Sequence, residues 1–227
     1  MTLRHLAVAL WLPLAACAGK PESTAETKTP SAPAAAAPAT SGDTSLLRAD
    51  KARIQGSDSA KVWFVMSSDF QCPFCRSFHK EVWPRIEKEY VATGKLRVAF
   101  LNHPMSFHQF AIPAAEAAMC AGRQDRFWPM HDKLFEAQDA WAKGGRAAAV
   151  FDSLAGTLGI RMEEWRACTS SHATRAMVEA DFARSSAGGV TGTPSFFIGD
   201  QLAVVGAEPY AAFRQAIEAA LAKAGGR

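Results

Sequence analysis

Apolar and polar positions along residues 47–227 predict short strands separated by helices. Residues 61–66 and 96–101 are apolar runs rich in β-branched and aromatic side chains, which is typical of buried strands. Between them, residues 76–93 carry apolar side chains at helical spacing, and Gly94 follows as a typical helix stop. The first part of the domain is therefore predicted to run strand, helix, strand.

Residues 104–188 form a block in which the periodicity is helical throughout. Glycine-containing joints separate the helices predicted at residues 111–121, 126–138, 146–158, 162–168 and 170–185. After this block, residues 195–198 and 202–205 flank Gly199-Asp200-Gln201 as a tight hairpin, and residues 207–224 form a last helix. This β-α-β, helical block, β-β-α order predicts an α/β protein with a thioredoxin fold and an inserted helical subdomain.

The amino terminus has the pattern of a secretory signal peptide over residues 1–16. A short basic start precedes an apolar run that is too short to span a bilayer, and small residues follow. The last four residues of this region, Leu-Ala-Ala-Cys ending at Cys17, resemble the lipobox of bacterial lipoproteins. That resemblance implies cleavage before Cys17 and lipidation of its thiol; an ordinary signal peptide cut nearby is the alternative. Residues 17–46, rich in Ala, Pro, Ser and Thr, are predicted to be a flexible linker.

Export places the domain in the periplasm, attached to a membrane through Cys17. By resemblance to enterobacterial sorting, Ala18 in place of Asp favours the outer membrane. Of the 227 residues, 48% are hydrophobic and 21% are charged, which is a globular composition and excludes wholesale disorder. A net charge of only +3 argues against nucleic-acid binding. With Cys17 lipidated, an even number of thiols remains, as suits an oxidising compartment.

The motif Cys72-Pro73-Phe74-Cys75 follows a predicted strand and its loop and lies at the start of a predicted helix. Residues three apart share a helix face, so the two sulfurs can meet, and the helix dipole favours a thiolate at Cys72. Cys72 is predicted to be the solvent-accessible attacking thiol and Cys75 the more buried resolving thiol. A zinc site is a weaker hypothesis than a redox site, because the sequence has no second paired Cys or His motif to complete the ligand set. A purely structural disulfide is the other alternative. Neither a metal nor a cofactor is expected.

At this point the sequence resembles the DsbA-like family of exported thiol–disulfide oxidoreductases. The resemblance rests on four stretches in family order, at residues 68–75, 114–121, 126–135 and 189–198. It implies that Pro194 is cis and lies against the Cys72–Cys75 pair, with the backbone of Thr193 free to pair with an extended substrate peptide. A proline that simply begins a strand is the alternative.

The sequence departs from the family at two positions near the site. Family members commonly carry a buried acidic residue six positions before the first cysteine, where this chain has Met66. That acid is thought to move the proton of the resolving thiol; Asp69 is a candidate substitute, although an Asp that caps a loop is the better expectation. Phe74 stands where the most oxidising members have His, which implies a less extreme oxidant.

Cys120 and Cys168 lie on two different predicted helices of the insertion. A structural disulfide is the default in an oxidising compartment, and some members of the family that this chain resembles have one here. Two separate buried thiols and a second redox-active pair remain the alternatives.

The resulting hypothesis is a membrane-anchored periplasmic thiol–disulfide oxidoreductase. Its expected partners are exported proteins with thiols or disulfides and a membrane redox partner that recycles the site. Two alternatives stay open: a reductase or isomerase that uses the same site, and a chaperone-like or Cu(I)-binding module. A peptide-binding face is considered for Phe70, Phe74 and Phe107, and no histidine is given a catalytic role.

Overall fold

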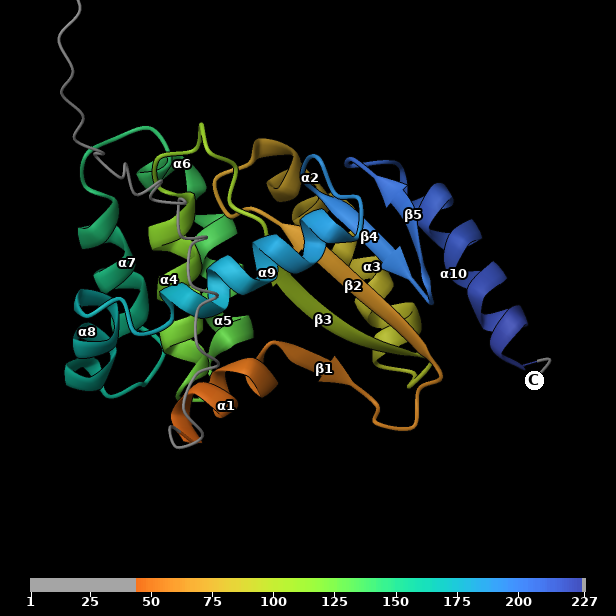
Figure 1. Ribbon diagram of the computed structural model, residues 1–227, viewed down its shortest axis with the longest axis horizontal. Helices are drawn as coiled ribbons and strands as arrows, with labels where there is room; N and C mark the ends of the chain where they lie inside the picture. Colours follow the sequence, from red (N-terminus) through yellow and green to blue (C-terminus); the bar gives the residue numbers. More distant parts are fainter. Residues whose placement is uncertain (1–43, 226–227) are drawn as a thin grey trace, which may run out of the picture. The chain divides into compact units, whose positions relative to one another are not determined.

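The computed structural model describes residues 44–225, so the predicted signal peptide, Cys17 and all but the end of the predicted linker lie outside the described residues. Its sheet has five strands in the order β1-β3-β2-β4-β5 (Figure 1). The strands are β1 Ile54–Gly56, β2 Val62–Ser68, β3 Leu96–Asn102, β4 Ser195–Ile198 and β5 Gln201–Val205. The central pair β2 and β3 is parallel, and every other neighbouring pair is antiparallel. The predicted hairpin is confirmed, with Gly199 at its turn in the left-handed region at φ +69°.

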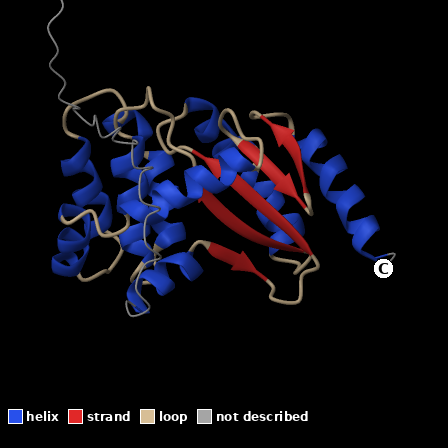
Figure 2. Ribbon diagram, viewed as in Figure 1, coloured by secondary structure: helices blue, strands red, loops and turns tan. Residues whose placement is uncertain are grey.

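Helices account for most of the rest of the described chain, and those of residues 111–170 gather at one end of the sheet (Figure 2). In chain order they are α1 Thr44–Ala52, α2 Pro73–Glu81, α3 Trp83–Ile86, the π-helical turn η1 Glu87–Val91, α4 Ala111–Gly122, α5 Phe127–Glu136, α6 Gln138–Trp141, α7 Ala147–Gly156, α8 Met162–Ser170, α9 Arg175–Ala187 and α10 Tyr210–Gly225. Helix α9 returns from the insertion to pack on β3, and α10 packs on β2, β4 and β5. This arrangement confirms the predicted thioredoxin fold with a helical insertion.

Alternating burial along β2 and β3 builds the core that supports the site. Both strands have the same burial pattern, in which Val62, Phe64 and Met66 of β2 and Leu96, Val98 and Phe100 of β3 are buried. The ring centroids of Phe64 and Phe196, the latter on β4, lie 5.6 Å apart. The ring centroid of Phe78 on α2 lies 4.4 Å from that of Phe196. Each such aromatic side chain stabilises the fold by about 1.5–3 kcal/mol through burial, so α2 is held firmly against the sheet.

The structure corrects the predicted helix over residues 76–93. The helix breaks at Val82, and α3 and η1 continue it with a changed backbone geometry. Pro84 is the physical reason, because it has no N–H to donate to Lys80 and its ring clashes with the preceding turn. Helix α2, which begins directly after Cys72, is therefore a short, separate unit.

The prediction also missed α1 and β1. The predicted linker, residues 17–46, runs into α1, which begins at Thr44 and buries Ala49. Strand β1 ends at Gly56, whose φ is +95° and whose missing Cβ would lie 2.4 Å from the carbonyl oxygen of Leu96. Only glycine fits this approach, because a side chain there would meet backbone.

A buried ion pair holds the end of β3 against α9. Arg53, which follows α1, donates to the carboxylate of Asp181 on α9, and both side chains are buried. The same Asp181 oxygen accepts the backbone N–H of Asn102 at 3.1 Å and its side-chain amide at 2.8 Å. Within residues 44–225, no helix is long and apolar enough to cross a bilayer.

Candidate active site at the start of helix α2

Cys72 and Cys75 lie together where β2 and its loop lead into α2. Cys72 is the residue that caps α2, with extended backbone geometry, and Pro73 is the first helical residue. The backbone N–H of Cys72 donates to Asp69 at 3.1 Å, and its carbonyl accepts from Arg76 at 3.2 Å. Pro73 fits here because its missing N–H would have no helical partner in any case. Both cysteines are free thiols in this structure.

Hydrogen bonds lower the pKa of Cys72 to about 6. The largest contribution is the hydrogen bond from the Cys75 thiol; burial opposes it, and the Thr193 side chain and the backbone N–H groups of Cys75 and Phe74 add to it. These two N–H groups belong to the first turn of α2, which leaves such donors without helical partners. Cys72 is therefore mostly a thiolate at neutral pH, the form that attacks disulfides.

Cys75 has the opposite electrostatics. Burial raises its pKa well above the usual value, and the neighbouring Cys72 sulfur raises it further. Its sulfur lies 3.5 Å from the backbone nitrogen of Asp69, which donates to it. Cys72 is 4% exposed and Cys75 1%, so the predicted order of burial is confirmed. The expected open exposure of Cys72 is not found, because Thr193 lies against its sulfur.

Thr193 and Pro194 come from a distant part of the chain and lie beside Cys72. The Thr193–Pro194 peptide bond is cis, and the backbone oxygen of Thr193 lies 3.4 Å from the Cys72 sulfur. Pro194 directly precedes β4, which pairs with β2, so the sheet itself brings the two segments together. The arrangement matches the one that the family resemblance implies.

Asp69 organises the loop and does not face Cys75 through its carboxylate. One carboxylate oxygen accepts the backbone N–H of Gln71 at 2.7 Å; the other accepts that of Met105 at 2.9 Å and lies 2.7 Å from Nδ1 of His108. With these three partners it acts as a loop cap. This confirms the expectation of an Asp that caps a loop; none of the three partners is Cys75, so these contacts give no support to Asp69 as the proton-transfer acid.

Two glutamines that the sequence reasoning missed hold the active-site loop to the insertion. Gln138 donates through one nitrogen to the carbonyls of Phe70, at 2.7 Å, and Cys72, at 3.0 Å. Gln71 accepts from the backbone of Phe110 at 2.6 Å and donates to the carbonyl of Ala142 at 2.8 Å. A CPxC motif gives no sign of these contacts, since both partners lie far away in the sequence.

The three aromatic residues considered for a peptide-binding face separate in the structure. Phe74 is 64% exposed and Phe107 is 73% exposed, so both remain available to a substrate. Phe70 is buried, and its ring stacks 5.0 Å from that of Phe100. Its predicted place on a surface is wrong, because β2 ends just before it and the chain turns inward there.

One group of three side chains in the described part of the chain has ligand atoms close enough to share a metal ion. These are His79, His131 and Asp132, whose ligand atoms lie within 4.8 Å of one another. The same carboxylate oxygen of Asp132 lies 3.1 Å from His79 Nε2 and 2.8 Å from His131 Nδ1. The Asp132 carboxylate therefore links the two imidazole rings through hydrogen bonds.

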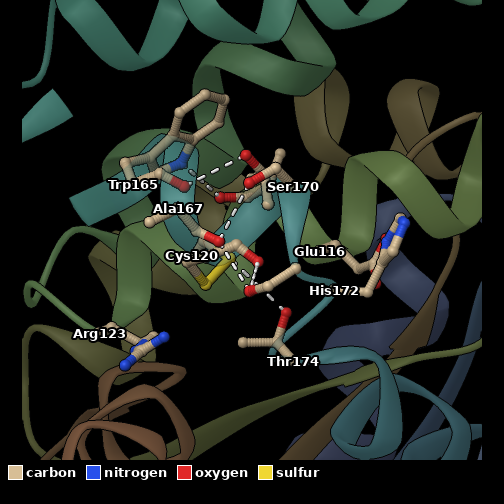
Figure 3. The surroundings of a disulfide bond; sticks show 12 residues. Glu116, Cys120, Arg123, Trp165, Ala167, Ser170, His172 and Thr174 are labelled. Atoms are coloured by element: carbon tan, nitrogen blue, oxygen red, sulfur yellow. Dashed lines mark hydrogen bonds and ion pairs between the residues drawn. A yellow bond between two sulfur atoms is a disulfide. The ribbon is translucent and has the colours of Figure 1, made fainter. Parts of the chain in front are cut away.

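Cys120 of α4 and Cys168 of α8 form a disulfide inside the insertion (Figure 3). Both residues are buried, and nearby Trp165 donates from its indole nitrogen to the carbonyl of Ala117 at 3.2 Å. Glu116, one turn before Cys120, is paired with His172 and Arg175. The disulfide therefore joins two helices that the Trp165–Ala117 hydrogen bond also links, while Glu116 pairs α4 with the start of α9.

The lowered pKa of Cys72 predicts how its alkylation varies with pH. We expect the rate of labelling by iodoacetamide to rise through pH 6 and to level off above it, since only the thiolate reacts. Cys75 should stay unlabelled over this range because its pKa is raised. Peptide mapping by mass spectrometry at pH 5–9 measures both. A Cys72 rate that still rises above pH 8, as for an ordinary thiol, would contradict the assignment.

Comparison with known proteins places this site in a family. The family model described as thioredoxin matches residues 48–219. Disulfide bond formation protein D of Bacillus subtilis is 27% identical over 157 residues, which cover 66% of this chain and 68% of that protein. Two further curated relatives, from Bacillus anthracis and Rickettsia prowazekii, are matched over 39% and 54% of their own lengths.

Solved structures agree with this placement. The crystal structure of oxidised BdbD from Bacillus subtilis has a TM-score of 0.68 at 25% identity, covering 75% of this chain and 92% of that one. The crystal structure of α-DsbA1 from Wolbachia pipientis shares the fold, with a TM-score of 0.66 at 21% identity over 76% of this chain and 92% of that one. The chain therefore belongs to the thioredoxin family and is a DsbA-like thiol–disulfide oxidoreductase.

Proposed function

We propose that this protein oxidises pairs of thiols in exported proteins through the Cys72–Cys75 disulfide. The observation that carries the proposal is the opposed electrostatics of the two sulfurs. The pKa of Cys72 is lowered to about 6, whereas burial raises that of Cys75. A stabilised Cys72 thiolate is both the attacking group and the better leaving group of the pair.

The exchange takes two steps in the oxidising direction. A substrate thiolate attacks the Cys72 sulfur; the Cys72–Cys75 bond breaks, and its electron pair goes to the Cys75 sulfur, which takes up a proton. A second substrate thiolate then attacks the substrate sulfur of the mixed disulfide, and Cys72 leaves as a thiolate. The substrate has lost two electrons to form its disulfide, and Cys72 and Cys75 have gained them.

The direction of the reaction follows from which form of the pair is stabilised. Interactions that stabilise the Cys72 thiolate exist only in the reduced form, so they favour reduction of the protein and oxidation of the substrate. Phe74 is exposed and supplies no charge to the sulfur. This supports an oxidant of moderate strength, as the family resemblance implied, in preference to a reductase or isomerase.

The direction can be tested with two test proteins. In its oxidised form, the wild-type protein should speed disulfide formation in a reduced, unfolded protein that has one pair of cysteines. With dithiothreitol as the electron source, it should reduce insulin only slowly. Fast insulin reduction without accelerated oxidation of the unfolded protein would favour the reductase. Tight stoichiometric Cu(I) binding with no exchange at all would favour the metal-binding alternative.

We also propose that the domain is exported and held at the periplasmic face of a membrane by lipid on Cys17. The support is the signal-peptide pattern and the Leu-Ala-Ala-Cys resemblance. Several acyl chains on one residue give stable attachment, where a single chain gives only marginal binding. The outer membrane is favoured because Asp does not follow Cys17.

Replacing Cys17 with serine is expected to release the processed protein from the membrane fraction and to leave its exchange rate in solution unchanged. The reason is that residue 17 and the described domain are separated by a stretch rich in Ala, Pro, Ser and Thr. Fractionation with immunoblotting, together with the oxidation assay, measures both effects. A processed variant that stays with the membrane would show that the lipobox assignment is wrong.

The proposed oxidase needs a partner that accepts its electrons. Each turnover leaves Cys72 and Cys75 reduced, so continued activity requires reoxidation of the pair. We propose that a membrane redox protein does this by disulfide exchange with Cys72. Phe74, inside the Cys72–Cys75 motif, is exposed and offers an apolar contact for such a partner or for a substrate.

A further inference from the structure

A small cavity borders the side chain of Cys75. Its volume is about 10 Å³, which is close to the least that holds one water molecule. Cys75, Ser68, His79 and His131 line it together with Met66 and several aromatic rings. The cavity thus joins the buried resolving thiol to two imidazole rings.

His79 has a ring nitrogen that nothing in the described part of the chain satisfies. His79 follows Cys75 by four residues on α2, so both side chains lie on the same helix face. Its Nε2 lies 3.1 Å from a carboxylate oxygen of Asp132. Its Nδ1 is buried and has no hydrogen-bond partner. With a proton on Nε2 for Asp132, the neutral ring carries a free lone pair on Nδ1.

Asp132 is held as a charged carboxylate behind this ring. Burial raises its pKa, but hydrogen bonds from His131 and His79 outweigh burial and lower the pKa well below its usual range. Burial lowers the pKa of His131, so that ring stays neutral and donates to the same oxygen at 2.8 Å. A fixed carboxylate beside an imidazole stabilises the positive charge that the ring acquires when it accepts a proton.

We propose that His79, oriented by Asp132, is the group that takes the proton from Cys75 and returns it during disulfide exchange. The inference rests on the proposed function. When Cys75 resolves a mixed disulfide, its proton passes to His79 Nδ1, directly or through one water in the cavity. The sulfur then attacks Cys72, and the partner thiolate leaves with its electron pair. In the oxidising direction, the same proton returns to the leaving Cys75 sulfur.

This assignment explains how the site works with a methionine at position 66. Met66 faces the same cavity, at the position where the resembled family commonly has its acid. The ionisable side chains that line the cavity therefore come from α2 and α5, and none comes from β2. The ionisable groups around His79 are Cys75 on its own helix, His131 and Asp132 on α5, and Glu87 on η1. Burial and the charge of Asp132 raise the pKa of Glu87, whereas His79 lowers it.

Ellman's reagent separates the two chemical steps and tests the role of His79. The Cys72 thiolate of the reduced protein attacks the reagent and releases one thionitrobenzoate; Cys75 then attacks the mixed disulfide and releases the second. In His79→Gln the first phase should be unchanged, whereas the second should slow by about 100-fold, a typical loss for a general base. Lys80→Gln, an exposed change on the same helix, serves as the matched control and should leave both phases unchanged.

The pH profile distinguishes proton transfer from a loss of structure. In the wild type, the second-phase rate should level off as the pH rises, because a side chain and not hydroxide takes the proton. In His79→Gln, it should keep rising with hydroxide over the whole range. Asp132→Asn should slow the same phase by less than His79→Gln does. Introducing Met66→Glu into the His79→Gln variant should restore part of the lost rate by returning an acid to the cavity.

The outcomes separate this inference from the proposed function. A second phase in His79→Gln with wild-type rate and pH profile would overturn the role of His79. A slow second phase that keeps the wild-type pH profile would overturn it as well, because that result indicates a structural effect. If the proposed function itself fails, the wild-type protein will not oxidise the unfolded test protein, whatever the phases with Ellman's reagent show.

Discussion

Replacing Cys75 with serine is expected to stop exchange at the mixed disulfide. The Cys72 thiolate should still attack oxidised glutathione, but no second sulfur would then release the adduct. We expect nearly all of the Cys75→Ser protein to persist as a glutathione adduct on Cys72, whereas the wild type should resolve to the Cys72–Cys75 disulfide. Intact-protein mass spectrometry after acid quenching measures the two species directly.

Cys72→Ser is the matched control, because it leaves the other sulfur in place. Cys75 is buried and its pKa is raised, so it should form no adduct at neutral pH. We expect loss of all measurable exchange in this variant. An adduct on Cys75, or the lack of any adduct on Cys72 in Cys75→Ser, would contradict the assigned order of attack.

Removing the Cys120–Cys168 disulfide is expected to cost about 4 kcal/mol of unfolding free energy. The disulfide closes a loop of 48 residues, and the chain-entropy relation gives roughly this value for such a loop. The comparison is best made between Cys72→Ala/Cys75→Ala and the same protein with Cys120→Ala and Cys168→Ala added, so that only one disulfide differs. Urea denaturation followed by circular dichroism measures the change.

The control for this prediction is activity. Cys120→Ala/Cys168→Ala with the active-site cysteines intact should oxidise the unfolded test protein at the wild-type rate below its unfolding transition. The disulfide joins α4 and α8 in the helical insertion, and Figure 1 shows these helices apart from α2. A destabilisation below about 1 kcal/mol would show that packing alone holds these helices. Loss of exchange in the folded variant would indicate a second redox pair.

The central features of the fold could be predicted from local patterns. The alternating burial of β2 and β3 is visible in the sequence as apolar runs, and the hairpin is marked by Gly199. Strand β1 could not be found this way because three residues give no periodicity. The break at Val82 was missed because Pro84 lies inside a helical apolar pattern that otherwise continues to Thr93.

In the site, too, local sequence patterns predicted some residues, whereas contacts between residues far apart in the sequence could not be predicted. The placement of Cys72 and Cys75 at a helix start follows from the spacing and from Pro73, and the family resemblance supplied Thr193 and Pro194. The contacts of Gln138 with the loop, and those of Asp69 with Met105 and His108, depend on the folded insertion and have no local signal. His79 did leave a signal, since it follows Cys75 by four residues, but only the structure shows its unpartnered nitrogen.

The measurement that tests the central claim most directly is the reduction potential of the Cys72–Cys75 couple. Equilibration with glutathione buffers, followed by alkylation and mass spectrometry, gives the fraction of the pair that is oxidised. The lowered pKa of Cys72 predicts a value between the roughly −270 mV of thioredoxin and the roughly −120 mV of DsbA. A potential at or below about −270 mV would make the protein a reductant and would contradict the proposed oxidase.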